Sequence, residues 1–176
     1  MRQARSALVL QGGGALGAYE LGAARALYKD GHFNPDVIAG VSIGAITAVL
    51  LARPASGLKP LEALEAFWEK VTVAGLMLPP ALRQYASFFG NRNFYVPRLD
   101  YFNWPSWTYL YDTMPLRDTL KQLVDLDSLA DRTAAPALLV TATDLEEGQI
   151  RLFYSREDKL TLDHIVASAA CLLRSR

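Results

Sequence analysis

A short segment, Gly40-Val41-Ser42-Ile43-Gly44, combines a hydroxyl with two glycines at a spacing that suits nucleophilic chemistry. Gly-x-Ser-x-Gly between a strand and a helix is the pattern of a nucleophile elbow, a turn so sharp that its serine takes a strained backbone conformation. The residues two before and two after the serine crowd one another, so both must be small, as Gly40 and Gly44 are. The following helix would place its dipole behind the hydroxyl and favour a developing negative charge. We therefore predict Ser42 as a nucleophile; the alternative is a tight turn with an incidental serine.

A second segment, "GGGALG", begins with the glycine triplet Gly12, Gly13 and Gly14 and admits two interpretations. It satisfies the G-x-G-x-x-G pattern of dinucleotide-binding proteins, which also need an acidic residue at the far end of the second strand. Asp36 follows at about the expected 20 residues, but it begins that strand. Alternatively, the bare amides of the triplet form an oxyanion hole for Ser42, because parallel strands end at one edge of a sheet. We favour the oxyanion hole and keep a nucleotide-binding module as the alternative.

The surrounding hydrophobic pattern alternates strands with helices. A central sheet of parallel strands with crossover helices is the arrangement that such alternation indicates. We predict an α/β sandwich formed by a single domain over residues 1–176. The predicted strands are 7–10, 35–40, 136–144 and 149–155, and the predicted helices are 15–31, 42–52, 58–72, 115–125 and 161–171.

Composition excludes several classes of protein. The 176 residues are 51% hydrophobic and carry 18 basic and 18 acidic side chains, so no basic excess indicates a nucleic-acid partner. The single cysteine, Cys171, allows no internal disulfide and suits a reducing compartment. The longest apolar run, residues 37–52, is too short to span a bilayer. Gln11 and the glycine triplet interrupt the apolar N-terminal stretch, so we expect a cytoplasmic first strand and not a signal peptide.

Residues 79–114 differ from the rest of the chain. They hold 11 of its 18 aromatic residues without a dominant period, which indicates an insertion of loops and short helical turns. These side chains either pack the insertion onto the domain, which we favour, or form an acyl channel, a lid or a peripheral membrane contact. The residues considered for this role are Phe88, Phe89, Phe94, Tyr95, Phe102, Trp104 and Trp107, with Arg83, Arg92 and Arg98 available to anionic head groups.

The two glycine-bearing segments, at this spacing, resemble those of the patatin-like phospholipases. "LVLQGGGALGAYELGAARAL" and "PDVIAGVSIGAITAVLLA" are similar to the family's first two motifs, and "VTATDLEEGQI" and "DHIVASAA" resemble its later strand and helix. The resemblance implies a three-layer sandwich with a mostly parallel sheet and helices on both faces. It also implies a serine lipid acyl hydrolase (phospholipase or esterase) that uses a serine–aspartate dyad with no metal and no cofactor.

By position, the resemblance makes Ser42 the nucleophile and Gly12, Gly13 and Gly14 the oxyanion hole. Two positions depart from the family's pattern. Gln11 replaces an aspartate in the manner of a bacterial-type member, and Leu16 replaces a frequent basic residue that could contact an anionic head group.

The general base is the largest departure. The family's Asp-Gly-Gly or Asp-Gly-Ala should follow the "ASAA" helix, where only "CLLRSR" remains, and the sole Asp-Gly pair, Asp30-Gly31, precedes the nucleophile. Asp144 is an alternative base, although a turn-capping carboxylate suits its position better, and His164 reads as a helix-packing residue. We therefore expect a truncated member of low turnover, with a non-catalytic lipid-binding remnant as a further alternative.

Overall fold

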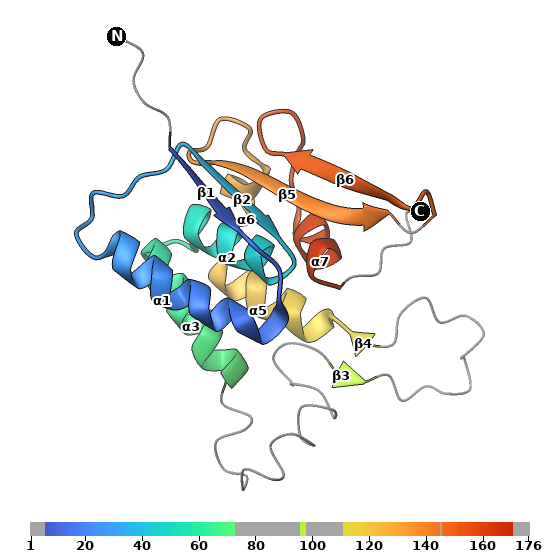
Figure 1. Ribbon diagram of the computed structural model, residues 1–176, viewed down its shortest axis with the longest axis horizontal. Coiled ribbons are helices and arrows are strands. Elements are labelled where there is room, and N and C mark those ends of the chain that lie inside the picture. Colours follow the sequence, from blue (N-terminus) through green and yellow to red (C-terminus); the bar gives the residue numbers. More distant parts are fainter. Residues whose placement is uncertain (1–5, 73–95, 98–110, 145, 171–176) are drawn as a thin grey trace, which may run out of the picture.

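The protein is described by a computed structural model over residues 6–72, 96–97, 111–144 and 146–170 (Figure 1). Its centre is a four-stranded sheet in the order β1-β2-β5-β6. The strands β1 (Ala7–Leu10), β2 (Val37–Val41) and β5 (Ala137–Asp144) run parallel, whereas β6 (Gln149–Tyr154) is antiparallel to β5. The predicted α/β class with a mostly parallel sheet is confirmed.

The parallel register brings the two glycine-bearing turns together. Leu10, the last residue of β1, pairs with Gly40 of β2, so both strands end at the same edge of the sheet. Strand β1 leads through a short 3-10 helix, η1 (Gly14–Leu16), into α1 (Gly17–Tyr28). Strand β2 leads directly into α2 (Ile43–Ala52). The position of the candidate site depends on this shared edge.

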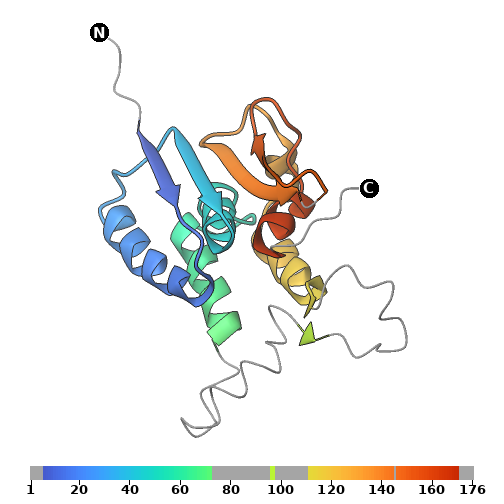
Figure 2. The same ribbon diagram turned by 45° about the vertical axis from the view of Figure 1, so that its right-hand side comes forward.

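The helix α2 forms the centre of the core. All of its residues are buried, and it packs against β1, β2 and β5 (Figure 2). A helix that is apolar on every side has no face for solvent and must be enclosed. The enclosure is completed by α1, α3 (Pro60–Thr72) and α7 (Leu162–Ala170), and α3 and α7 in turn contact α5 (Met114–Leu123).

Helices α2 and α7 both pack on the sheet and also contact each other, so they share one face of it. Alternate strand residues such as Ile38, Leu138 and Val140 are fully buried on that face. The opposite face carries exposed apolar side chains, with Val9 at 72% and Ile150 at 76% exposure. Burial on this sheet therefore follows the two-residue alternation of a strand.

Most boundaries lie within a few residues of those predicted from the sequence. The first helix ends at Tyr28 because Gly31 takes a positive φ of 67° and its N–H donates to the Tyr28 carbonyl. A short helix that the sequence analysis missed, α6 (Leu126–Ala130), begins at Asp125, whose carboxylate accepts hydrogen bonds from the backbone N–H groups of Asp127 and Ser128.

Within the predicted insertion, β3 (Val96–Pro97) and β4 (Tyr111–Asp112) form an antiparallel pair. The aromatic and arginine residues proposed for lipid contact, as well as Cys171, lie outside the described residues. Their roles stay predictions.

A buried arginine ties the C-terminal end of α2 to the chain that leads into β5. Arg53 is 1% exposed, and its guanidinium donates hydrogen bonds to four backbone carbonyls, those of Ala52, Ser128, Ala134 and Pro136. The fixed fork of an arginine suits such a divergent set of acceptors. These hydrogen bonds join α2, α6 and the chain before β5 at the end of the sheet opposite the two glycine-bearing turns.

Candidate active site

The elbow at Ser42 has the backbone geometry that its sequence pattern predicts. Ser42 has φ 57° and ψ −125°, and it is the only non-glycine residue with a positive φ in the described part of the chain. Such a conformation costs on the order of 1–3 kcal/mol and persists only where the surroundings enforce it. A β-carbon on Gly40 would lie 2.2 Å from the Gly44 carbonyl oxygen, so the flanking positions admit no side chain.

The main chain of the elbow is held by a residue from far along the sequence. The backbone N–H of Ser42 donates a hydrogen bond of 2.8 Å to the hydroxyl of Ser168 on α7. Ser168 is buried, whereas Ser42 is half-buried. Among the described residues the Ser42 hydroxyl itself has no hydrogen-bond partner, so this oxygen is not committed to a structural contact.

Gly12, the first residue of the glycine triplet, lies directly against this serine. A β-carbon on Gly12 would lie 3.1 Å from the Ser42 β-carbon and 3.8 Å from its hydroxyl oxygen. Gly13 and Gly14 have φ angles of 149° and 57°, which side chains rarely allow. All three glycines are exposed. The loop therefore presents bare, accessible backbone beside a free hydroxyl.

The elbow and the glycine loop also touch through their main chains. A β-carbon on Gly44 would lie 2.6 Å from the Leu10 carbonyl oxygen and 2.7 Å from that of Gln11. One on Gly17 would lie 2.5 Å from Cγ1 of Ile43. The start of α2 thus packs against the end of β1 and the start of α1 with no space between them.

Sequence reasoning missed three polar residues at this junction: Ser168, Glu20 and Thr47. The Thr47 hydroxyl donates a hydrogen bond of 2.9 Å to the Glu20 carboxylate. Burial raises the pKa of Glu20, while this hydrogen bond and the backbone N–H of Gln11 lower it. A single polar residue inside an otherwise apolar helical stretch, as in "AITAVLLA" and "IVASAA", was the available signal.

Asp144 lies at the end of β5, where the sequence placed it, but its carboxylate is occupied locally. It accepts hydrogen bonds from the backbone N–H groups of Glu146 and Glu147 and from the Arg151 side chain. The hydrogen bond from Glu147, together with those from Glu146 and Arg151, lowers the pKa of Asp144 despite its burial. These contacts are those of a carboxylate that caps its own turn.

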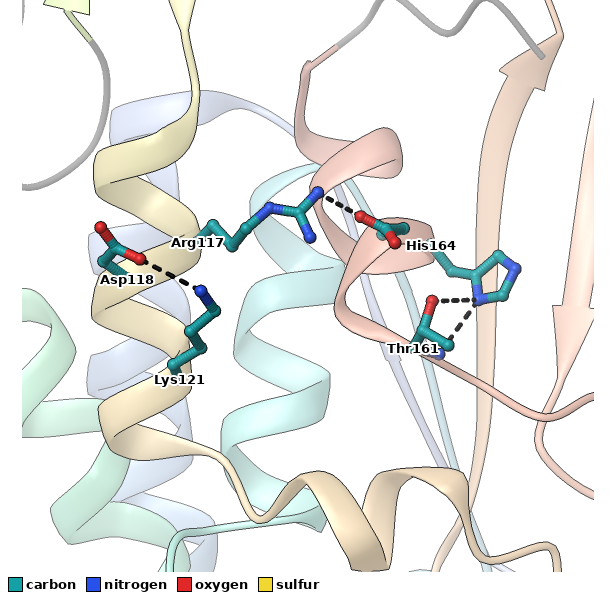
Figure 3. A network of polar contacts seen from close by, with 6 residues as sticks. Arg117, Asp118, Lys121, Thr161 and His164 are labelled. Carbon is teal, nitrogen blue, oxygen red and sulfur yellow. Dashed lines mark hydrogen bonds and ion pairs between the residues drawn. The ribbon is translucent and has the colours of Figure 1, made fainter. Parts of the chain in front are cut away.

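His164 is held at the start of α7 (Figure 3). Its Nδ1 accepts a hydrogen bond of 3.1 Å from the backbone N–H of Thr161, while its own backbone N–H donates to the Thr161 carbonyl. The ring packs on Phe153 of β6 at a centroid distance of 4.4 Å. Arg117 of the neighbouring helix α5 forms an ion pair with Asp163 of α7, and Lys121 pairs with Asp118 within α5. His164 therefore has a helix-capping and packing environment.

Asp36, the acidic residue that a dinucleotide site would need, lies at the wrong edge of the sheet. Its carboxylate accepts a hydrogen bond of 2.7 Å from the backbone N–H of Ser6, which precedes β1. The glycine triplet follows the other end of that strand. This separation leaves the dinucleotide interpretation without its ribose-binding partner.

A parallel sheet whose second strand ends in a strained serine, beside a glycine loop from its first strand, is the arrangement of an α/β protein with a nucleophile elbow. The sequence profile of the patatin-like phospholipase family matches residues 8–172. The chain belongs to this family, and with it to a group of lipid acyl hydrolases. No curated protein matches the chain.

Two further findings concern the described residues alone. They contain no group of three or more His, Cys, Asp or Glu side chains arranged to hold a metal ion. None of their helices combines the length and the apolar character that crossing a membrane requires.

Proposed function

We propose that the chain is a serine acyl hydrolase of the patatin type, which cleaves lipid acyl esters through Ser42 and the amides of Gly12, Gly13 and Gly14. The observation that carries this proposal is the contact between the two motifs, in which the β-carbon position of Gly12 lies 3.8 Å from the Ser42 hydroxyl oxygen. A carbonyl carbon attacked by that oxygen would have its own oxygen beside the glycine loop. Amides placed at such a position are worth roughly 3–4 kcal/mol each to the transition state.

In the proposed reaction the Ser42 oxygen attacks the ester carbonyl carbon and its proton passes to a general base. The carbonyl oxygen becomes an oxyanion, stabilised by the glycine amides and by the N-terminal dipole of α2. The intermediate collapses, the protonated alcohol leaves, and an acyl-serine ester forms. Water then attacks this ester and releases the fatty acid, which restores the hydroxyl.

No Asp-Gly-Gly or Asp-Gly-Ala sequence occurs among the 176 residues, so the proposal assigns no general base. Asp144 is not assigned this role, because its carboxylate already accepts the N–H groups of its own turn. His164 is not assigned it either, because Nδ1 accepts the Thr161 N–H. A serine without a base retains its strained position and its oxyanion hole, so it should react slowly with strong electrophiles but turn over poorly.

The test is labelling of the purified chain with a fluorophosphonate, followed by mass spectrometry of the modified peptide. We expect slow modification at Ser42, none in Ser42→Ala, and an unchanged rate in Asp144→Asn. A dinucleotide added in excess should give no protection. Modification elsewhere, or full ester hydrolysis that persists in Ser42→Ala, would show that the nucleophile is wrongly assigned. Loss of labelling in Asp144→Asn would instead make Asp144 the base.

A separate part of the proposal concerns residues 79–114, for which we favour packing on the domain and keep peripheral membrane contact as the alternative. In that alternative, the chain would sit at a lipid surface with its substrate ester, within the cytoplasm. Co-sedimentation with anionic liposomes, compared between the chain and a deletion of residues 88–107, measures this contact. Equal sedimentation of both would assign these residues to packing of the domain. Liposome binding that survives Ser42→Ala without any labelling of the parent chain would favour a non-catalytic lipid-binding remnant.

A further inference from the structure

Three chain segments that build the site meet at the carboxylate of Glu20, which lies in the first turn of α1. The Thr47 hydroxyl of α2 donates to Oε2 at 2.9 Å. The backbone N–H of Gln11, the residue immediately before the glycine triplet, lowers the pKa of the same carboxylate. The Glu20 side chain thus bonds α1, which follows the triplet, to α2, the helix that follows the nucleophile.

The hydrogen bond from Thr47 is directed away from its own helix. A hydroxyl has a single proton to donate, and the Thr47 oxygen has two acceptors in range, the Glu20 carboxylate at 2.9 Å and the Ile43 carbonyl at 3.1 Å. The carboxylate is the nearer acceptor, and hydrogen bonds to ionised groups are the stronger kind. Thr47 is 1% exposed, so its hydroxyl has no access to water as an alternative partner.

The packing around the Glu20–Thr47 hydrogen bond links it to the conformation of the glycine loop. The main chain at Gln11 abuts Gly44, and Gly17 abuts Ile43, so α1, α2 and the end of β1 are already in contact. Gly13 and Gly14 beyond Gln11 have no side chains and take positive φ angles. Such residues have the largest conformational freedom to lose. The direction of the triplet's backbone N–H groups therefore depends on how firmly the chain on either side of the triplet is held.

We propose that Glu20 is a positioning residue that anchors the glycine loop to the nucleophile-bearing helix and so fixes the direction of the triplet's amides toward Ser42. The expected effect on the reaction rests on the proposed function, whereas the expected effect on the conformation of the glycine loop does not. Glu20 acts through its hydrogen bond from Thr47, and it does not contact the reacting atoms.

The test compares Glu20→Ala, Thr47→Val and the conservative Glu20→Gln by two measurements. The first is the rate of Ser42 modification by fluorophosphonate, separated into the reagent's binding constant and the maximal rate constant. The second is hydrogen–deuterium exchange of a peptide that covers residues 8–16. Glu65→Ala is the matched control, because Glu65 of α3 pairs with Arg25 on the same helix, α1, at 2.7 Å.

We expect Glu20→Ala to lower the maximal rate constant about tenfold with little change in reagent binding, since misplaced amides lose part of an effect worth 10²–10³-fold. Exchange of the 8–16 peptide should rise. Thr47→Val should change both quantities in the same direction by a smaller amount. Glu20→Gln should keep most of the parental rate, because an amide oxygen still accepts the Thr47 hydrogen bond. Glu65→Ala should change neither the rate constant nor the exchange.

Two outcomes overturn the inference while leaving the proposed function intact. The first is a folded Glu20→Ala variant whose Ser42 labelling rate and 8–16 exchange equal those of the parent chain. The second applies if Glu20→Ala does not fold, and it is a Thr47→Val variant in which the labelling rate and the exchange are both unchanged. If the parent chain is not labelled at Ser42 at all, the proposed function fails, and the exchange of residues 8–16 alone decides the anchoring.

Discussion

The backbone N–H of Ser42 and the hydroxyl of Ser168 form a hydrogen bond of 2.8 Å between residues 126 positions apart. It joins the strained residue of the elbow to α7, a helix that otherwise packs on α2 and β5. An N–H at the start of a helix has no intrahelical acceptor. Ser168, which is buried, supplies that acceptor and so helps to enforce the Ser42 conformation.

Replacement of Ser168 by alanine should therefore affect both stability and reactivity. Leaving the Ser42 N–H unsatisfied should cost about 1–3 kcal/mol of unfolding free energy, and fluorophosphonate labelling of Ser42 should slow. Ser155→Ala is the matched control, because Ser155 is also buried and its hydroxyl accepts the Leu138 N–H at 2.8 Å near the start of β5. It should lose similar stability in urea denaturation but label at the parental rate. Equal labelling rates in both variants would contradict a role for Ser168 at the elbow.

Glycine positions in the chain should differ sharply in their tolerance of alanine. At Gly44 the added β-carbon would lie 2.6 Å from a backbone oxygen, which cannot move independently of the sheet. Gly44→Ala should cost more than about 3 kcal/mol or prevent folding. Gly22→Ala on α1 meets nothing within 4 Å and should stabilise the chain by up to about 1 kcal/mol. Thermal unfolding followed by circular dichroism measures both, and a well-folded Gly44→Ala variant of parental stability would be inconsistent with the packing described here.

Arg53 should be the least replaceable charged residue among those described. Arg53→Met would remove the guanidinium donor from the carbonyls of Ala52, Ser128, Ala134 and Pro136, of which Ser128 would keep the Asp131 N–H. At about 1–3 kcal/mol for each unsatisfied buried group, even partial relaxation should leave a loss above about 3 kcal/mol. Arg53→Lys should recover only part of it, because an ammonium cannot reach the same divergent acceptors. Arg25→Met, which breaks an exposed ion pair, should cost less than about 1 kcal/mol in the same denaturation experiment.

The pH dependence of stability should reveal the burial of Glu20. Its folded-state pKa is raised above 4.5 by burial, so the folded state binds the proton more tightly than the unfolded chain does. The resulting stabilisation is complete below pH 4.5 and is lost as pH rises through the raised value. Glu20→Gln should therefore gain stability relative to the parent chain as pH rises above 4.5. Denaturation at several pH values measures this difference, and a gain that appears only on acidification would have the opposite sign to that expected.

Much of the fold followed from local patterns. Strands at 7–10 and 136–144, the helix after the elbow and the partner strand β6 were predictable, because alternation, helical spacing, glycine and proline act over a few residues. The short helix α6 was missed because its signal is a single capping residue, Asp125, ahead of only five helical residues.

The sequence alone determined which chemistry this chain is suited to: a serine flanked by glycines after one strand, a glycine triplet after another, and a spacing that resembles one family. Only the tertiary structure decided that Gly12 lies against Ser42 and that Glu20, Thr47 and Ser168 hold the junction. The physical reason is distance along the chain. Hydrogen bonds that join residues 27 or 126 positions apart depend on how parallel strands and their helices pack, and no local pattern of residue types records that packing.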